Sequence, residues 1–319
     1  MSTAIPLLPA PFPYFGGKSR AAAECWRRFG DVRNYVEPFF GSGAMLLGRP
    51  GEFSGNETIN DFDGYVANFW RAIKHAPDET AMWADNPVNE NDLHARHVWL
   101  VQRRDGLAAK LEGDPDWYDP KIAGWWVWGM SCWIGSGFCS GKGPWHVVDG
   151  ELIREGNNGH GVNRQLVHLS DSGHGESRLC AWFQSLSDRI SRVRVCSGDW
   201  ARICGPSVTF KHGVTAVFLD PPYADTAKRT ANIYRCDSES VAHKVREWAV
   251  ENGKRDDMRI ALCGYEHEHD MPADWSVHSW KANGGFGSQS TTHANPNARK
   301  ERIWFSPACL NPAQMELSQ

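Results

Sequence analysis

The sequence predicts an α/β fold in which short apolar strands alternate with helices, interrupted by a long insert of different composition. Two strand ends carry that prediction. The strand-like run Tyr35–Phe40 passes through Gly41–Gly43 into an apolar helix start, and the run Ala216–Leu219 ends in Asp-Pro-Pro-Tyr at Asp220–Tyr223. A strand that enters a helix through glycines is typical of the ligand-binding turn in open α/β sheets, because glycine lets the backbone turn tightly and approach a ligand.

The N-terminal part contains two strand–helix units. Its second strand is expected around Ile59. Apolar residues with helical spacing predict helices over Ser19–Phe29 and Tyr65–Ile73, and Gly43–Leu47 is expected to be the start of another helix. The part after the insert predicts further helices at Arg178–Ile190 and Ser240–Val250, with strands at Val193–Cys196, Ala216–Leu219 and Ile260–Cys263.

Asp61 follows the second strand, eighteen residues after Gly43. An acid about 20 residues beyond a glycine turn, at the end of the next strand, is placed to bind ribose hydroxyls. The alternative role for Asp61 is the N-cap of a helix over Gly64–Lys74.

The glycine turn lacks the sequence patterns that bind phosphate groups. The third glycine of the dinucleotide fingerprint is absent. Gly17-Lys18-Ser19 is similar to the end of a phosphate loop, but the earlier glycine that such a loop needs would fall at Phe12. The pattern therefore favours a nucleoside-like cofactor over a nucleoside triphosphate.

The tetrapeptide at Asp220–Tyr223 forms a stiff strand end. Each proline fixes its own φ, lacks an N–H donor and keeps the preceding residue out of the helical region. The Asp220 carboxylate and the Pro221 carbonyl can accept both hydrogens of an amino group on a planar ring that stacks on Tyr223. The alternative is a strand stop with a capping acid.

Composition sets the protein class. The chain has 319 residues, 41% hydrophobic and 23% charged, which is ordinary for a globular protein, and it contains no apolar run near the ~18 residues of a membrane span. The N-terminus lacks a secretion signal, and nine irregularly spaced cysteines indicate reduced thiols in a cytoplasm. A net charge of −4 argues against a protein that coats DNA by charge alone. His267–His269 is expected to be a surface cluster rather than a zinc site.

These blocks resemble the Dam-like adenine-specific (N6) DNA methyltransferases, which use S-adenosylmethionine, in the alpha arrangement of motifs. The blocks occur in the family's order over residues 11–75 and 190–306. They are Pro13–Ser19, Glu37–Gly43, Asn60-Asp61, Gly198–Trp200, Asp220–Tyr223 and Arg299–Trp304. The resemblance implies a Rossmann-like methyltransferase sheet with an inserted target-recognition module, over residues 1–75, 76–177 and 178–306, followed by a frayed tail at 307–319.

The resemblance also implies roles for individual residues. Asp220, Pro221, Pro222 and Tyr223 form the catalytic tetrapeptide, and Asp220 also borders the cofactor. Tyr14 and Lys18 line the cofactor, and Lys18 pairs either with the cofactor carboxylate or with Asp220. The methionine part and the ribose of the cofactor are expected to contact Glu37, Phe39, Gly41, Gly43 and Asp61. Asp199 and Trp200 are expected to flank its adenine.

The insert is expected to contact double-stranded DNA. Residues 76–175 contain many prolines and glycines and most of the tryptophans. The tryptophans at 125, 126, 128 and 133 are expected to pack in a core. The polar loops over 136–164 either follow the DNA backbone or are solvated, and Lys142, Arg154 and Arg164 are the candidate contacts. Lys228 and Arg229, after the tetrapeptide, form a second candidate clamp or a surface loop.

The predicted activity is methyl transfer from S-adenosylmethionine to N6 of an adenine flipped out of the duplex. Two alternatives stay open: an amino-methyltransferase acting on cytosine N4 or RNA, and a catalytically silent regulator that binds cofactor or DNA. No metal is expected. Besides DNA, the protein is expected to have either no partner or a separate restriction nuclease as its partner.

Overall fold

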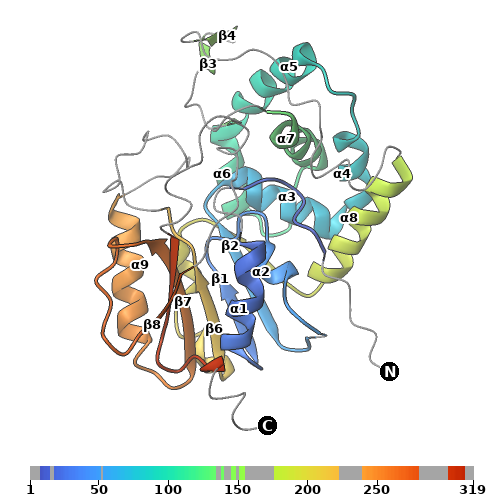
Figure 1. Ribbon diagram of the computed structural model, residues 1–319. Coiled ribbons are helices and arrows are strands. Elements are labelled where there is room, and N and C mark those ends of the chain that lie inside the picture. Colours follow the sequence, from blue (N-terminus) through green and yellow to red (C-terminus); the bar gives the residue numbers. More distant parts are fainter. Residues whose placement is uncertain are drawn as a thin grey trace.

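The computed structural model describes residues 8–14, 18–51, 53–133, 138–139, 145–148, 151–154, 176–222, 239–279 and 301–312 (Figure 1). Its main sheet has the strand order β5-β2-β1-β6-β7-β9-β8. The strands are β1 (Asn34–Glu37), β2 (Asn56–Asp61), β5 (Arg194–Ser197), β6 (Thr215–Leu219), β7 (Met258–Tyr265), β8 (Ser276–Ser279) and β9 (Glu301–Phe305).

The sheet is mostly parallel. Neighbouring strands from β5 through β7 pair in parallel, whereas β9 runs antiparallel to both β7 and β8. The predicted α/β class, with a Rossmann-like sheet, is confirmed. The helices outside the insert are α1 (Ser19–Phe29), α2 (Ala44–Leu47), α3 (Gly64–His75), α8 (Glu176–Ile190) and α9 (Glu239–Asn252), with 3-10 turns η1 (Trp200–Ile203) and η2 (Phe210–His212).

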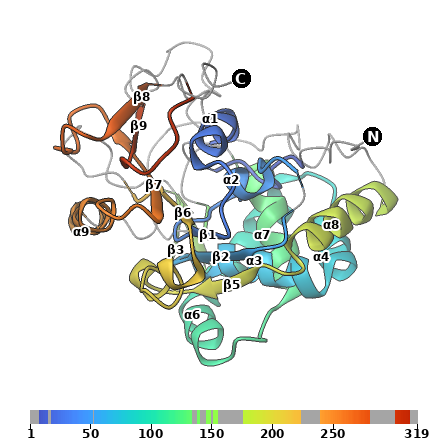
Figure 2. The ribbon, with the colours of Figure 1, turned by 90° about the horizontal axis from the view of Figure 1, so that it is seen from below.

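Helices cover both faces of the sheet (Figure 2). On one face, α1, α2 and α3 bury a core that includes Tyr35, Phe40 and Trp70. On the other face, α9 packs over a smaller core that includes Val36, Val217 and Leu219. Tyr35 and Val36 belong to different cores because successive side chains of a strand point to opposite faces.

In its described residues the insert is mainly helical. It contains α4 (Pro77–Ala84), α5 (Glu90–Val101), α6 (Arg104–Gly113) and α7 (Pro120–Cys132), followed by the hairpin of β3 (Trp145–Val148) and β4 (Glu151–Arg154). Figure 1 shows this hairpin beyond α5, far from the main sheet. The expectation of loops over 136–164 is therefore wrong where β3 and β4 pair.

Helix α7 is the centre of the insert. Trp126, Trp128 and Trp133 are buried, which confirms the predicted packing role, and Trp125 is half-buried against the same core. Gly124 permits close contact with α4, because a Cβ at this position would lie 2.4 Å from the Cβ of Trp83.

Two expectations are wrong in part. His267 is exposed, as predicted, but the second histidine of its cluster is not. His269 is buried and its ring meets Trp304 edge to face, because the chain after β7 folds back over Gly264. Among the described residues, no group of His, Cys, Asp or Glu could hold a metal ion. The tail is not frayed at 307–312, because Leu310 N donates to Arg28 O of α1 at 2.8 Å.

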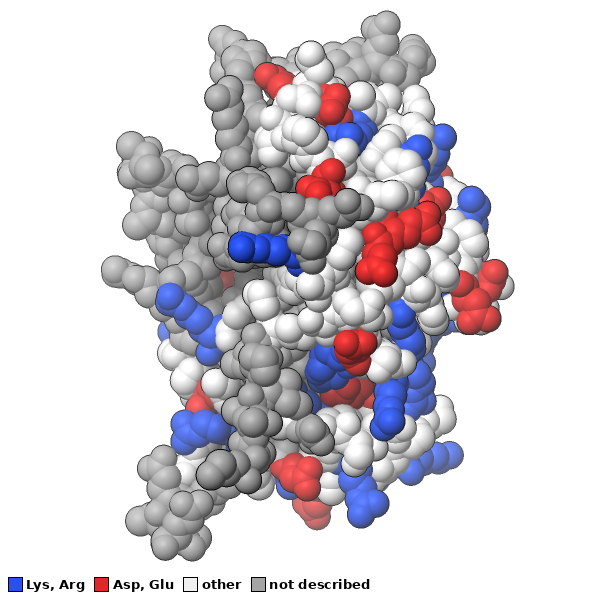
Figure 3. Space-filling model, turned by 90° about the vertical axis from the view of Figure 1, so that its right-hand side faces the viewer, with Lys and Arg blue, Asp and Glu red and all other residues white. Residues whose placement is uncertain are grey.

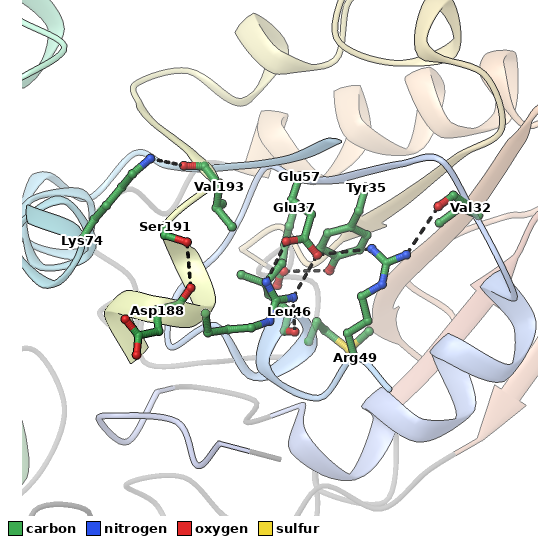
Figure 4. A network of polar contacts seen from close by, with 12 residues as sticks. Val32, Tyr35, Glu37, Leu46, Arg49, Glu57, Lys74, Asp188, Ser191 and Val193 are labelled. Atoms are coloured by element: carbon green, nitrogen blue, oxygen red, sulfur yellow. Dashed lines mark hydrogen bonds and ion pairs between the residues drawn. The ribbon is translucent and has the colours of Figure 1, made fainter. Parts of the chain in front are cut away.

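A buried charge network joins α8 to the sheet (Figure 4). Glu57 of β2 accepts hydrogen bonds from Arg189 at 2.7 and 2.9 Å and from Arg49 at 3.2 Å. The side chains of Glu57 and Arg49 are almost fully buried. Because α8 follows the insert in the chain, this network fixes the return of the chain to the sheet.

The described surface is mixed in charge on the face over α4 and α8. Figure 3 shows basic and acidic residues interspersed there, rather than gathered by sign. Such a face offers no extended basic track for a phosphate backbone. In the described part of the chain, no helix has the length and apolar character needed to cross a membrane.

Candidate active site

The predicted cofactor and catalytic residues that the structure describes lie at one edge of the sheet, whereas Arg154 lies in the β3–β4 hairpin of the insert. Strands β1 and β6 are parallel neighbours at which the strand order reverses, since β2 and β5 lie on one side and β7 on the other. Ligands of open α/β sheets bind outside the carboxyl ends of the strands at such a switch point. Val36 pairs with Val217, so Phe39 after β1 and Asp220 after β6 lie at the same level.

The glycine turn after β1 is tightly braced. Gly41 and Gly43 have φ values of 51° and 74°, which lie in the left-handed region that favours glycine. A Cβ at Gly41 would lie 2.5 Å from the Tyr14 ring, so this ring covers the turn. Trp70 donates from Nε1 to Gly41 O at 2.9 Å, and Asn60 donates from Nδ2 to Pro38 O at 3.1 Å. The turn is therefore held in shape by β2 and α3.

Asp61 connects the end of β2 to the glycine turn. Its carboxylate accepts hydrogen bonds from Gly41 N at 2.9 Å and Asp63 N at 2.8 Å. The N-cap of α3 is Asp63, which accepts from Tyr65 N. The capping alternative for Asp61 is therefore wrong. A carboxylate accepts several hydrogen bonds at once, which is the chemistry that ribose hydroxyls need.

Aromatic side chains border this edge. The rings of Phe39 and Trp200 stack with centroids 6.3 Å apart, and Trp200 meets Trp248 of α9 edge to face. Asp199 is exposed, and its side chain caps η1 by accepting a hydrogen bond from Ala201 N at 2.9 Å. Phe62, directly after Asp61, is 56% exposed. Sequence reasoning missed Phe62, and its only signal was a large apolar residue beside the predicted ribose acid.

Lys18 and Asp220 form a largely buried ion pair. Lys18 Nζ lies 2.9 Å from Asp220 Oδ2, and the two side chains are 6% and 15% exposed. Glu301 Oε2 lies 3.8 Å from the same ammonium. Of the two predicted partners of Lys18, the structure shows Asp220. Pro221 is buried and Pro222 is half-buried.

Glu37 lies beneath this edge rather than on its surface. Its side chain is buried and accepts a hydrogen bond of 2.7 Å from the Tyr35 hydroxyl. Burial raises the pKa of Glu37 well above its ordinary value, and Asp220 and Asp61 add to the effect by like charge, against the hydrogen bond from Tyr35. The raised pKa therefore favours the protonated form of Glu37 at the base of the site.

Comparison with known proteins finds a family match over part of the chain. Residues 14–104 match the family model of the D12 class N6 adenine-specific DNA methyltransferases. The chain carries a D12 class N6 adenine-specific DNA methyltransferase domain. The match supports an enzyme that methylates DNA at adenine N6. No curated protein matches the chain.

The methyltransferase match covers only part of the predicted site. Tyr14, Lys18, the glycine turn and Asp61 lie inside residues 14–104, whereas Asp199 and Asp220 lie beyond them. Five predicted residues fall outside the described residues: Tyr223, Lys142, Arg164, Lys228 and Arg229. Arg154 is the last residue of β4.

Glu37→Gln is expected to change how the stability of this methyltransferase depends on pH. In the unfolded chain Glu37 ionises near 4.5, whereas the folded protein retains the proton to higher pH because the pKa is raised. Stability from the neutral acid is therefore fully present below about 4.5 and is lost as pH rises through the folded pKa, at about 1.4 kcal/mol per pH unit while the two states differ by one proton.

The glutamine variant has no such proton, so its free energy of unfolding should fall less between about pH 5 and 8. Urea unfolding at both pH values measures this, with the exposed Glu251→Gln as the matched control. Equal losses in the variant and the parent would show that Glu37 is ionised in the folded protein.

Proposed function

We propose that the protein transfers a methyl group from S-adenosylmethionine to N6 of an adenine flipped out of duplex DNA, with Asp220 and the Pro221 carbonyl as the groups that hold the amine. One observation carries the proposal. Asp220 stands at the carboxyl edge of the sheet, fixed at 2.9 Å from Lys18 and level with the glycine turn. The family match supports the reaction class but stops short of Asp220.

The residues after β1 and β2 fit S-adenosylmethionine. The turn requires glycine, because a Cβ at Gly43 would lie 2.8 Å from the Phe40 ring and 2.9 Å from the Trp70 ring. It brings backbone rather than side chains to the ligand. Asp61 suits two ribose hydroxyls, and the exposed ring of Phe62 suits an adenine face. We assign Tyr14, Phe39, Asp199 and Trp200 to the same cofactor site.

The bound cofactor supplies a methyl group on a sulfonium, which is a strong electrophile. The task of the protein is to make the adenine amine a better nucleophile, because the lone pair of that amine is delocalised into the ring. Asp220 and the Pro221 carbonyl each accept one amine hydrogen, which favours tetrahedral nitrogen and directs its lone pair at the methyl group. The N–C bond forms as the C–S bond breaks, and the nitrogen then loses one proton to solvent.

Adenine in a duplex is stacked and paired, so the enzyme must take the base out of the helix. We assign Tyr223 to stack on the flipped base, a contact worth roughly 1–3 kcal/mol in nucleic-acid sites. Lys142, Arg154 and Arg164 of the insert, with Lys228 and Arg229, are our candidate DNA contacts. We place the reaction in the cytoplasm, with the enzyme acting alone or beside a separate nuclease.

Mass spectrometry of the product tests this function. The full-length protein is incubated with S-adenosylmethionine and unmodified duplex DNA, which is then digested to nucleosides. N6-methyl-2′-deoxyadenosine is the expected product. Methylcytosine as the product would contradict the assignment of adenine as the substrate. A digest without methylated nucleosides, from a protein that binds the cofactor, would contradict the proposed reaction on duplex DNA.

Asp61→Ala is expected to weaken S-adenosylmethionine binding about tenfold to a hundredfold. A hydrogen bond to a charged group contributes about 1.5–3 kcal/mol, and this variant also removes the brace on Gly41 N. Isothermal titration calorimetry measures the change in Kd.

Asp63→Ala is the matched control for Asp61. This substitution removes the helix cap two residues away, so it should lower stability by about 1 kcal/mol while leaving the Kd unchanged. Equal affinity in the Asp61 variant and the parent protein would remove Asp61 from the cofactor site.

A further inference from the structure

Glu301 is the third member of a buried charge cluster at the catalytic edge. The Lys18 ammonium lies 2.9 Å from Asp220 and 3.8 Å from Glu301. The side chains of Lys18, Glu301 and Asp220 are 6%, 8% and 15% exposed. One buried cation therefore faces two carboxylates, and an ammonium has three donor positions to share between them.

The sheet register explains why Glu301 reaches this cluster. Leu219 of β6 pairs with Leu262 of β7, so Asp220 lies level with Cys263, and Cys263 pairs with Ile303 of β9. Glu301 precedes Ile303 by two residues, which puts both side chains on the same face of the sheet. Ile303 packs in the core beneath α1, and Lys18 is the residue that precedes α1.

We infer that Glu301 is a positioning residue for methyl transfer. It pairs with the Lys18 ammonium, so that Lys18 orients Asp220 without neutralising the whole charge of the Asp220 carboxylate. Asp220 must accept a hydrogen from the adenine amine, and a cation bound to that carboxylate alone would compete with the amine. Glu301 supplies a second acceptor, which holds Lys18 in place while Asp220 engages the substrate. This inference rests on the proposed role of Asp220.

Other titratable groups surround the cluster. Glu37 faces Asp220 from β1, Cys263 from β7, and the Cys25 thiol lies near Lys18 on α1. Burial raises the pKa of both Cys263 and Cys25, so neither thiol carries charge at neutral pH. Burial likewise raises the pKa of Glu37, which favours its protonated form. Lys18, Asp220 and Glu301 are therefore the charged groups of the cluster that determine its electrostatics.

Glu301→Gln is the test, because it removes the charge and keeps the size of the side chain. With one carboxylate gone, Lys18 acts more strongly on Asp220. We expect kcat to fall about tenfold or more, while the KM values for DNA and S-adenosylmethionine change less than about twofold.

Two further variants make the test specific. Glu266→Gln is the matched control, because Glu266 pairs with Arg302 at 2.5 Å at the same end of the sheet and is 40% exposed. It should keep the parental kcat. Glu301→Asp keeps the charge and should recover most of the kcat that glutamine loses. If the glutamine variant does not fold, a folded aspartate variant with most of the parental kcat supports the inference.

The results separate this inference from the proposed function. A parental kcat in Glu301→Gln, or an equal loss in Glu266→Gln, would overturn the role of Glu301. So would a folded aspartate variant that loses as much kcat as glutamine does. The proposed function fails on a different result, normal methyl transfer by an Asp220 variant.

Discussion

Replacing Asp220 by alanine is expected to abolish methyl transfer while cofactor binding largely survives. The carboxylate is the only charged acceptor among the proposed amine-holding groups, and the loss of one such preorganised polar group costs about a hundredfold to a thousandfold in turnover. In the proposed site the cofactor is held mainly by the glycine turn and Asp61, which do not depend on Asp220. Transfer of a radiolabelled methyl group to duplex DNA measures the turnover, and calorimetry measures the Kd for S-adenosylmethionine.

The structure also indicates that this variant will fold. After loss of Asp220, the buried Lys18 ammonium still has Glu301 at 3.8 Å, so it is not left as a buried charge without an acid. Asp116→Ala, which removes an exposed acid from the loop before α7, is the matched control and should keep full activity. Normal methyl transfer by the Asp220 variant would refute the mechanism.

Sequence reasoning predicts those parts of the site that are formed by residues close together in the chain. The strand-to-glycine turn and the acid after β2 are local patterns, and each falls where its strand ends. Parallel strands bring such ends to one edge, so the grouping of Asp61, Asp220 and the glycine turn follows once the sheet is parallel. The boundaries moved by a few residues, since β1 ends at Glu37, before Pro38, rather than at Phe40.

The contacts that sequence reasoning missed are long-range or hidden by burial. Glu301 meets Lys18 from the opposite end of the chain, and no local spacing connects the two residues. Helix α7 is buried on nearly all sides, so it lacks the polar face that marks an amphipathic helix. Its glycines also lower the expectation of a helix, although Gly124 and Gly129 are where Trp83 and Phe138 approach.

Glu57→Ala is expected to produce the largest loss of stability, about 3–5 kcal/mol. The Glu57 carboxylate pairs with Arg189 at 2.7 Å and Arg49 at 3.2 Å in a site from which water is nearly excluded. Removing one partner of a buried ion pair leaves an uncompensated buried charge, and here two guanidinium groups lose the same acid. Burial already lowers the pKa of Arg49, which shows that this cation depends on Glu57.

The contrast with an exposed ion pair decides whether burial is the cause. Arg255 and Asp257 make two short hydrogen bonds, at 2.8 and 2.9 Å, but both side chains are well exposed. Exposed pairs contribute little, so Asp257→Asn should leave the urea midpoint almost unchanged. A double variant, Glu57→Leu with Arg49→Met, should recover part of the loss by removing one buried cation with its acid. Similar midpoint shifts for Glu57→Ala and Asp257→Asn would mean that the Glu57 network is hydrated and does not secure α8 to the sheet.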